Sequence, residues 1–496
     1  MAWSIRYETH AMQTITKPLD VLIIGAGLSG VGTACHIARE FPNKTIALIE
    51  RRKTLGGTWD LFRYPGIRSD SDMASFGYGF KPWLSSKVLA DGPAIRDYVI
   101  ETAKEFKLYE KTHFGLQTQT ANWSSKDKLW TLVTRNEDSG EEQVFTCRYL
   151  ISCTGYFNHD YGYRPEFPGE ENFKGQIIHP QQWPEDLDYS NKRVVVIGSG
   201  ATAVTLLPAM AEKVSHITML QRSPSYVFAL PNKDKVSDTL GKFLPGSVVF
   251  KLARGRNIAI QRALYISCRR WPNAMRKFLL SQVEKQIGPN IDMRHFTPKY
   301  MPWDERLCVV PDGDLFKALL SGKASIETDH IGRFTEKGIL LKSGKELEAD
   351  IIISATGLTL QMLGGMAITV DGEARPLNEQ MVYKDLLIEN IPNLAWVFGY
   401  TNAPWTLKAD LAGRYLCRLF KHMDAEDKTV AMPVSPPGIA LDVGIVDSLQ
   451  SGYVQRAKDI MPRQGKRAPW QVTMHYGKDK AMLLKDAVAD EALRMH

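Results

Sequence analysis

Two glycine-rich turns, each directly after an apolar strand-like run, most restrict how this 496-residue chain can fold. The first lies in "LDVLIIGAGLSG" and holds Gly25, Gly27 and Gly30; a helix-like stretch and the apolar run "TIALIE", ending at Glu50, follow it. In such a unit the glycines allow a tight turn, a close pyrophosphate approach and helix–strand packing. Amides at the helix start bind phosphate, and the acid accepts hydrogen bonds from ribose hydroxyls. The unit therefore predicts a dinucleotide site.

The pattern recurs in "KRVVVIGSGATA", with Gly198, Gly200 and Ala203 at the three fingerprint positions. The strand-like run after the next helix ends in Arg222 and Ser223 instead of an acid. An arginine at this place is typical of a site for the 2′-phosphate of NADP. A charge-assisted hydrogen bond contributes about 1.5–3 kcal/mol, enough to favour NADPH over NADH. A surface arginine that meets only solvent is the alternative. The acid-terminated first unit suits FAD, so the chain is predicted to bind FAD and NADPH.

Strands that alternate with helices predict an α/β fold with two Rossmann-like dinucleotide-binding domains, one for FAD and one for NADP. Two apolar runs that stop at Thr-Gly, "YLISCTGY" and "DIIISATGL", mark where the chain is expected to pass between the domains. The predicted segments are an N-terminal extension at 1–17, the FAD domain at 18–155, the NADP domain at 156–384 and a C-terminal return to the FAD domain at 385–496.

Composition is that of a globular protein, with 44% hydrophobic and 24% charged residues. The net charge of +7 suits anionic small ligands, and without a Lys/Arg-rich tail we expect no nucleic-acid partner. Six scattered cysteines, with no CxxC pair, argue against a metal site and against a flavin disulfide reductase. With no apolar signal-peptide core at the start, a cytoplasmic location is expected. The uncharged run at 351–370 is interpreted as a buried strand plus turn rather than a membrane span.

Residues 230–297 do not follow the α/β pattern and predict a helical insert in the NADP domain. Within them, the stretch at 251–277 holds eight Lys and Arg residues, no acid, and apolar residues at helical spacing. One interpretation is a helical subdomain whose basic face is simply solvated. The other is a cap over a substrate channel that also rests on acidic lipid, because basic amphipathic helices favour that surface.

Two further motifs give the chain a family resemblance. The stretch "FKGQIIHPQQWP" matches the Baeyer–Villiger fingerprint with Phe173, Gly175, His179, Trp183 and Pro184. The stretch "GGTWDLFRYPGIRSD" at 56–70 matches a second pattern of the same family. With the two glycine fingerprints, the chain resembles the class B flavoprotein monooxygenases of the Baeyer–Villiger type. It is most similar to their ethionamide-activating branch, through "YPGIRSDSD", "WDERLC" and "GYTNAPWTLKAD".

The resemblance implies contacts for both cofactors. For FAD, in addition to the fingerprint glycines and Glu50, these are Ser29, Gly57, Thr58, Trp59, Asp60, Leu61, Asp70 and, through its backbone, Thr118. For NADP they are Arg68, Ser69, Asp70, Gly198, Ser199, Gly200, Ala201, Thr202, Ala203, Val204, Arg222 and Ser223. Trp303 and Trp405 are candidates for the substrate site, although core packing is the commoner role of tryptophans in such segments.

The resemblance also implies a reaction. In the family, NADPH reduces FAD, and dioxygen then forms a peroxyflavin that converts ketones to esters or lactones, or oxygenates soft sulfur and nitrogen centres. Arg306, in "YMPWDERLCVVPDG", corresponds to the arginine that stabilises the peroxyflavin, and Asp70 would orient it. Many relatives carry Lys or Arg just before this arginine, whereas Glu305 stands here, which leaves Arg222 more of the phosphate binding.

Several alternatives remain beside this prediction. We interpret His179 as a hinge residue between the domains rather than a catalytic base, because flavin chemistry leaves it no obvious proton to move. A flavin monooxygenase that acts mainly on sulfur or nitrogen is the nearest rival activity. A non-enzymatic nucleotide sensor would keep both glycine fingerprints but would need neither Arg306 nor Asp70. The expected partners are a small ketone or sulfide and dioxygen, and the expected assembly is a monomer or small homo-oligomer.

Overall fold

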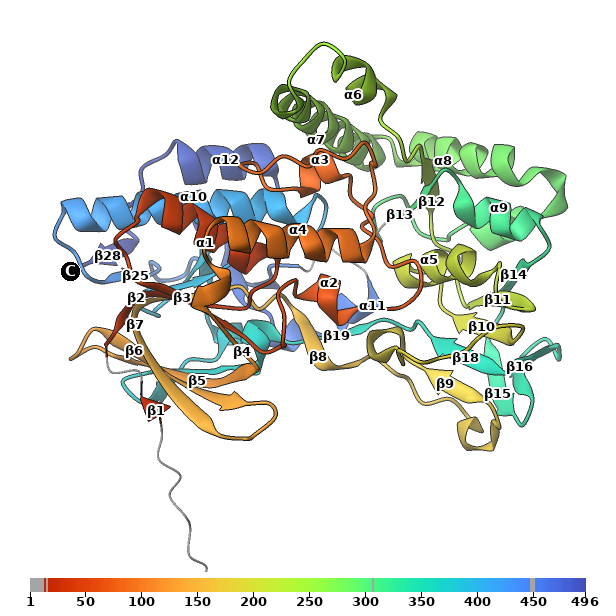
Figure 1. Ribbon diagram of the computed structural model, residues 1–496, viewed down its shortest axis with the longest axis horizontal. Coiled ribbons are helices and arrows are strands. Elements are labelled where there is room, and N and C mark those ends of the chain that lie inside the picture. The colour runs from red at the N-terminus through yellow and green to blue at the C-terminus, as the bar shows by residue number, and fades with distance from the viewer. Residues whose placement is uncertain (1–12, 15–16, 306, 447–450) are drawn as a thin grey trace, which may run out of the picture.

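The computed structural model describes residues 13–14, 17–305, 307–446 and 451–496. Two α/β bodies lie side by side, each built around its own sheet; helix α8 lies above the second body, and α6 and α7 reach over α3 of the first (Figure 1). The predicted fold class, two dinucleotide-type domains with a helical insert, is confirmed.

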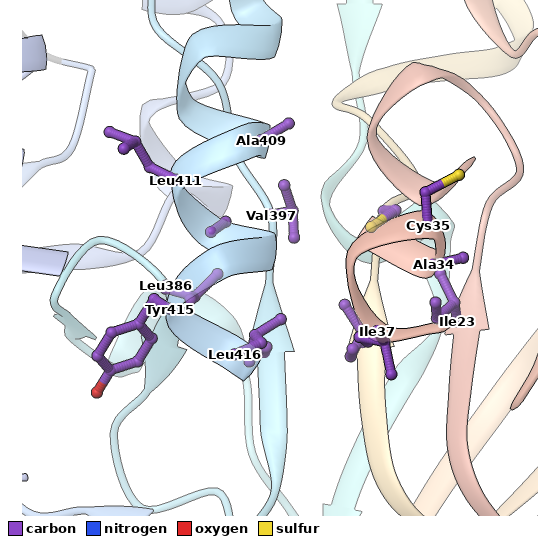
Figure 2. Packing of buried hydrophobic residues seen from close by; sticks show 14 of the residues in the cluster. Ile23, Ala34, Cys35, Ile37, Leu386, Val397, Ala409, Leu411, Tyr415 and Leu416 are labelled. Atoms are coloured by element: carbon purple, nitrogen blue, oxygen red, sulfur yellow. The ribbon is translucent and has the colours of Figure 1, made fainter. Parts of the chain in front are cut away.

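The first sheet has a parallel centre. Strand β2 (Leu19–Ile24) pairs with β3 (Ile46–Glu50) on one side and β7 (Glu142–Ser152) on the other, and β3 pairs with β4 (Thr112–Phe114). Helix α1 (Leu28–Glu40) packs against α10 (Trp405–Ala425), and both bury apolar faces in one cluster with β2. Figure 2 shows members of this cluster, among them Ile23, Ala34, Ile37, Ala409 and Leu416.

An antiparallel meander extends this sheet. Strands β5 (Leu116–Ser124) and β6 (Leu129–Asn136) run on to β7 and alternate between buried and partly exposed residues, as expected for a sheet with one covered face. Strand β20 (Ala367–Val370) pairs in parallel with β5, and β24 (Leu394–Trp396) with β7. The chain is thus back in the first sheet by Ala367, earlier than the boundary of 384/385 that we expected.

The second sheet is entirely parallel, with strand order β14-β11-β10-β18-β9. Its three central strands, β11, β10 and β18, are mostly buried apolar runs because both faces are covered there. The strands of the whole sheet are β9 (Gln176–Ile178), β10 (Arg193–Ile197), β11 (His216–Gln221), β14 (Ala324–Thr328) and β18 (Ile351–Ser354). Helices α5 (Ala201–Met210) and α9 (Asp314–Leu320) belong to this body, as does a small sheet of β15 (Ile331–Thr335), β16 (Gly338–Leu341) and β17 (Glu346–Glu348).

Two antiparallel segments connect the bodies. Strand β8 (Phe157–Gly162) leads into the second body, and β19 (Leu358–Leu360) leads back and pairs with it. The uncharged run at 351–370 is therefore β18 of one sheet, the crossing strand β19 and β20 of the other, not a membrane span. Among the described residues, no helix combines the length and the apolar character that crossing a membrane requires.

The insert contains α6 (Lys235–Leu240), α7 (Gly246–Arg270) and α8 (Pro272–Ile287). Strand β12 (Val227–Leu230) precedes it and pairs with β13 (Cys308–Pro311), which follows it. The remaining elements are short apart from α4 and α12: β1 (Gln13–Thr14), α2 (Thr58–Leu61), α3 (Met73–Phe76), α4 (Gly92–Glu105), β21 (Glu373–Ala374), β22 (Val382–Tyr383), β23 (Leu387–Ile388), β25 (Ala431–Pro433), β26 (Ala440–Gly444), α11 (Gly452–Gln455), β27 (Arg463–Gly465), α12 (Tyr476–Leu484) and β28 (Leu493–Met495).

Candidate active site

A cavity of about 820 Å³ brings together residues of the first body, the crossing segments and the insert. Most residues predicted to bind FAD line it, although they come from segments far apart in the sequence. They are Gly25, Gly27, Ser29, Glu50, Gly57, Thr58, Trp59, Asp70 and Thr118.

The glycines of the first fingerprint are required by close backbone contacts. Gly25 has φ +93°, and a Cβ there would lie 2.6 Å from the carbonyl oxygen of Cys153. A Cβ on Gly30 would lie 1.8 Å from the carbonyl oxygen of Gly25, so Gly30 serves packing and does not line the cavity. Helix α1 begins after Gly27 with no capping side chain among the described residues and no acid in its first turn. Its amides and positive dipole end therefore suit a pyrophosphate.

Glu50 and Thr118 shape another part of the cavity. Glu50 is buried, and its Oε2 accepts a hydrogen bond from the amide of Ala26 at 2.7 Å while Oε1 accepts one from the amide of Arg52 at 2.9 Å. Burial raises the pKa of this carboxyl, and the two amides partly offset that effect. The Oγ1 of Thr118 is buried and has no hydrogen-bond partner among the described residues. Both groups fit the adenosine half of a dinucleotide, and the Thr118 hydroxyl is available in addition to the backbone contact we expected.

Trp405 and the start of α10 line the cavity as well. The Nε1 of Trp405 donates a hydrogen bond to the Oγ of Ser29 at 2.8 Å, and its ring stacks on Tyr156 at 5.1 Å between centroids. Helix α10 has no acid in its first turn, so its positive end favours negative charge in the cavity. The sequence alone did not decide whether Trp405 lines the substrate site or packs in the core. Trp303, left open in the same way, also lines the cavity.

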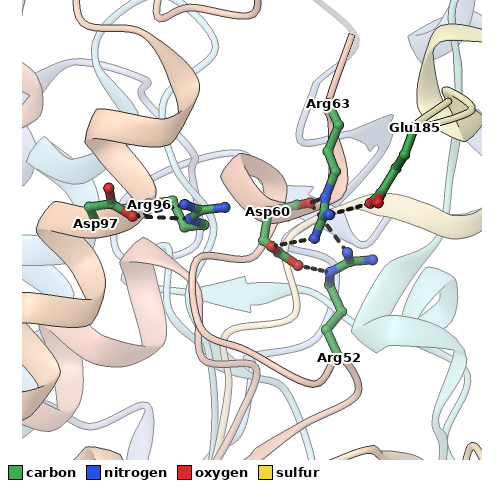
Figure 3. Close-up of polar contacts among 6 residues, drawn as sticks. All are labelled: Arg52, Asp60, Arg63, Arg96, Asp97 and Glu185. Carbon is green, nitrogen blue, oxygen red and sulfur yellow. Dashed lines mark hydrogen bonds and ion pairs between the residues drawn. The ribbon is translucent and has the colours of Figure 1, made fainter. Parts of the chain in front are cut away.

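The side chains of Asp60 and Leu61, both expected at FAD, do not line the cavity. The Oδ2 of Asp60 accepts a hydrogen bond from the Nε of Arg52 at 2.6 Å, and its Oδ1 accepts one from the Nη2 of Arg63 at 3.0 Å (Figure 3). Arg63 also pairs with Glu185. Leu61 is buried in the apolar cluster of the second body. The two side chains thus fix the short helix α2 between the bodies, and only their backbone remains available to the cofactor.

The second fingerprint lies at the carboxyl end of β10, the central strand of the second sheet, and outside this cavity. Gly198 has φ +136°, and a Cβ there would lie 2.4 Å from the carbonyl oxygen of Ala355. A Cβ on Gly200 would meet no described atom within 4 Å, so the backbone at the start of α5 is open to a ligand. The predicted NADP residues gathered here are Gly198, Ser199, Gly200, Ala201, Thr202, Ala203, Val204, Arg222 and Ser223.

Arg222 and Ser223 follow β11 and are exposed. The Oγ of Ser199 donates to the carbonyl of Ser223 at 2.8 Å and so ties the glycine turn to the end of this strand. Glu305 lies within electrostatic reach of Arg222, whose charge opposes the increase in the pKa of Glu305 that burial causes. Arg306, the predicted catalytic residue, lies outside the described residues. Its neighbour Leu307 lines the cavity.

Arg68, Ser69 and Asp70 separate in the structure, because only Asp70 lines the cavity. Asp70 is exposed and accepts no hydrogen bond from the described residues. Arg68 bonds through Nη1 to the Oδ2 of Asp314 at 2.8 Å, and its buried Nη2 has no partner among the described residues. Ser69 donates to the carbonyl of Ser71 at 2.9 Å. Of these three residues, Arg68 is therefore the one whose side chain has a hydrogen-bond donor free for a ligand bound at the second body.

His179 lies between the two crossing segments. Its Nδ1 accepts a hydrogen bond from the amide of Gln181 at 3.2 Å, so Nε2 carries the proton that it donates to the carbonyl of Gly357 at 3.1 Å. A Cβ on Gly162, at the end of β8, would overlap the imidazole. Burial lowers the pKa of His179, and the residue does not line the cavity. This placement suits the predicted hinge role, which stays a prediction.

The other residues of this motif serve packing. Phe173 is buried and stacks on Phe334 at 6.3 Å between ring centroids. A Cβ on Gly175 would lie 2.3 Å from the carbonyl oxygen of Asp350, the residue just before β18. Trp183, followed by Pro184, meets Tyr189 edge-on at 6.4 Å. The motif thus attaches the entry segment to the second sheet.

Sequence reasoning missed part of the cavity wall. Gln361 and Gly364, after the second crossing strand, line it, and so do Asn257 and Gln261 of α7. A positive φ of +64° at Gly364 marks a turn that the sequence "LGGM" could have suggested. The residues of α7 carried no local signal, because only the docking of the insert brings them to the cavity.

Comparisons with known proteins agree with this architecture. A model of the flavin-binding monooxygenase-like family matches residues 89–421, and an NAD(P)-binding Rossmann-like domain model matches residues 23–89. A putative FAD-containing monooxygenase of Mycobacterium tuberculosis, MymA, is 62% identical over 97% of this chain and 98% of its own. The FAD-containing monooxygenase EthA of the same organism is 46% identical over the same shares. A steroid monooxygenase structure bound to NADP superposes with a TM-score of 0.77 at 20% identity, over 97% of this chain and 99% of that one.

Proposed function

The chain belongs to the flavin-binding monooxygenase-like family, and we propose that it is a Baeyer–Villiger enzyme that converts ketones to esters or lactones. It is a flavoprotein monooxygenase that uses FAD and NADP(H), as the family resemblance predicted. One observation carries the ketone proposal. A single cavity joins the residues that fit FAD to apolar residues of the insert, including Ile260, Leu264 and Phe278, so cofactor and organic substrate would share one space.

The residues of the first body fit FAD and would hold it along its length. Glu50 and Thr118 would bind the adenosine half, and the start of α1 would bind the pyrophosphate. Trp405, held by Ser29, and the positive end of α10 would face the flavin half. When bound and reduced by NADPH, FAD supplies the activation of dioxygen. The protein supplies orientation, charge and the exclusion of water.

Arg306 is the residue we infer to stabilise negative charge on the reacting oxygen. Arginine suits this task because it stays protonated and presents a planar set of donors. Asp70 would orient it. Two features support the pairing: the Asp70 carboxylate lines the cavity and accepts no hydrogen bond from the described residues, and Leu307, next to Arg306 in sequence, also lines the cavity.

Replacing Arg306 tests the proposal. In Arg306→Ala we expect the FAD content and the oxidation of NADPH to persist, with reduced oxygen released as hydrogen peroxide. Ester formation should fall by roughly 100-fold or more, since removal of one oxyanion donor has that effect in other enzymes. The exposed Arg333→Ala is the matched control. Ester yield would be measured by gas chromatography on a ketone panel, and an unchanged yield in Arg306→Ala would overturn the role of Arg306.

Oxygenation of thioethers is the second candidate activity. The apolar residues of the insert that line the cavity suit a thioether as well as a ketone. A thioether panel run beside the ketones separates the two cases. Sulfoxide without ester in the wild-type protein would assign the chain to the sulfur-oxidising side of the family.

A further inference from the structure

Helix α7 of the insert makes polar contacts on the face that it turns to the rest of the molecule. The Nη1 of Arg254 donates to the carbonyls of three α3 and post-α3 residues, Ala74, Ser75 and Gly77, at 2.8–3.0 Å. One and two turns on, Asn257 donates through Nδ2 to the Oδ1 of Asp72 at 2.7 Å, and Gln261 bonds the same carboxylate. The insert is therefore anchored on the first body by charge and hydrogen bonds.

The opposite face of α7 carries an exposed stripe of apolar and small residues. Val248, Leu252, Gly255, Ala259, Ala263 and Ile266 follow one another at spacings of four or three residues, so they form one stripe along the helix. All six are exposed, and Leu252 retains 51% of its accessible surface. A surface helix of a soluble protein normally turns its apolar stripe to the core. Helix α7 does bury Val249, Phe250, Ala253 and Cys268, so the exposed stripe is a second apolar face that no described part of the chain covers.

The apolar surface continues onto the α6–α7 connection, which stands at the upper margin of the molecule in Figure 1. Val236 and Leu244 are exposed, and Phe243 retains 80% of its accessible surface. Leu84 of the first body, itself exposed, borders Gly246 at the start of α7. Of the fourteen exposed large hydrophobic side chains among the described residues, nine belong to the insert. Such clustering marks an interaction surface rather than scattered exposure.

Charge indicates what covers this surface. Residues 230–297 hold thirteen Lys and Arg against four Asp and Glu, a net charge of +9, whereas the rest of the chain carries −2. Lys242 and Lys251 are exposed beside the apolar residues, as are Arg262 and Arg270. A second copy of the chain would place like charges against one another. An anionic lipid surface complements both the basic residues and the apolar stripe.

The cavity reaches the same surface. Ile260 and Phe278 line the cavity and are also exposed, with Ile260 retaining 59% of its accessible surface. Leu264, one turn after Ile260, lines the cavity as well. A ligand that lies in the outer part of a bilayer would meet apolar side chains from this surface to the cavity.

We propose that the outward face of α7 and the α6–α7 connection dock on an anionic lipid membrane, with the cavity opening toward it. The docked enzyme takes lipophilic substrates from the bilayer. This inference concerns membrane binding and does not depend on which substrate the enzyme oxygenates.

Flotation of the FAD-loaded, full-length protein with vesicles tests the proposal. Vesicles of phosphatidylcholine with roughly 30% phosphatidylglycerol, which gives the surface a negative potential, are compared with vesicles of phosphatidylcholine alone. Both kinds are tested at low and at high salt. We expect binding to the anionic vesicles that weakens at high salt. Phe243→Ser combined with Leu252→Ser should reduce binding roughly tenfold or more, because each residue would lose the burial of a large side chain. Leu320→Ser, at a similarly exposed site on α9, is the control.

A second variant isolates the charge. Lys242→Gln and Lys251→Gln should each lower binding to anionic vesicles about fivefold. FAD absorbance and NADPH oxidation with a small water-soluble ketone, which need not come from a membrane, report on folding and should be unchanged in every variant.

Three results would overturn the proposal. They are no vesicle binding, equal binding to neutral and anionic vesicles, and equal loss in the Leu320→Ser control. A second outcome concerns self-association. If the wild type does not bind vesicles, and the Phe243/Leu252 variant has a lower apparent mass than the wild type in size-exclusion chromatography, then the surface pairs two copies of the chain and the membrane assignment is wrong. Vesicle binding without any ketone oxidation would leave this inference standing and refute only the proposed reaction.

Discussion

Gly200→Ala tests whether the glycine turn after β10, in the second sheet, binds the nicotinamide dinucleotide. Gly200 has an extended backbone with φ −81°, which alanine adopts without strain, and the added Cβ would meet no described atom within 4 Å. The variant should therefore fold and keep FAD. The Cβ would instead occupy the space through which a pyrophosphate approaches the backbone.

The expected loss follows from that geometry. Losing one charge-assisted amide–phosphate hydrogen bond costs about 1.5–3 kcal/mol, equivalent to roughly a 10- to 150-fold increase in the KM for NADPH. Gly27, the corresponding position of the first unit, would be a poorer test, because a Cβ there would lie 3.3 Å from the Cα of Gly57. Gly255→Ala, in α7, is the matched control, since its Cβ also meets no described atom within 4 Å.

Stopped-flow reduction of the flavin at varied NADPH concentration gives the assay. The visible spectrum first establishes that Gly200→Ala holds as much FAD as the wild type. The observed reduction rate then yields the NADPH concentration at half saturation. An unchanged half-saturation in a flavin-loaded variant would refute the reasoning, and with it the assignment of the second fingerprint.

Two further predictions concern charge and pH. Arg222→Ala should raise the KM for NADPH about 10- to 150-fold and leave the KM for NADH nearly unchanged. Glu305→Gln should lower the KM for NADPH, because it removes a negative charge that acts on Arg222. Steady-state kinetics with both coenzymes test both variants. His159 lines the cavity, and burial lowers its pKa from 6.5 to about 4. Because its folded pKa is depressed, its contribution to stability is present above pH 6.5 and is lost as the pH falls toward 4, by about 3 kcal/mol in total. Urea unfolding at pH 7 and pH 4.5 should therefore show a smaller acid-induced loss in His159→Gln than in the wild type; equal losses would contradict the assignment.

Local sequence was enough to predict both nucleotide units. Gly25 and Gly198 have positive φ values that residues other than glycine rarely adopt, so each tight turn needs a glycine there. The few residues around each turn are enough to recognise it. The apolar runs before these turns were equally readable, since buried parallel strands carry apolar residues on both faces. Family membership followed from the same short motifs.

Docking decided what the motifs left open. Trp405 bonds Ser29 across 376 positions of sequence, so no local pattern could choose between cavity and core for it. Asp60 sits within a motif predicted to run along FAD, but Arg52 and Arg63 draw its carboxylate away from the cavity. The return to the first sheet at Ala367, not at 385, depends on the free edge of β5, which becomes a partner only once the meander has formed.

The sequence by itself determined the two fingerprints, the acid and the arginine that end them, and the basic, helical character of the insert. Only the tertiary structure decided which face of α7 points outward, because periodicity gives the stripe but not its direction. The polar partners of Asp72 lie about 185 residues away from it on α7, and their bonds, together with the burial of Val249 and Phe250, fix the inward face of the helix and leave the stripe exposed.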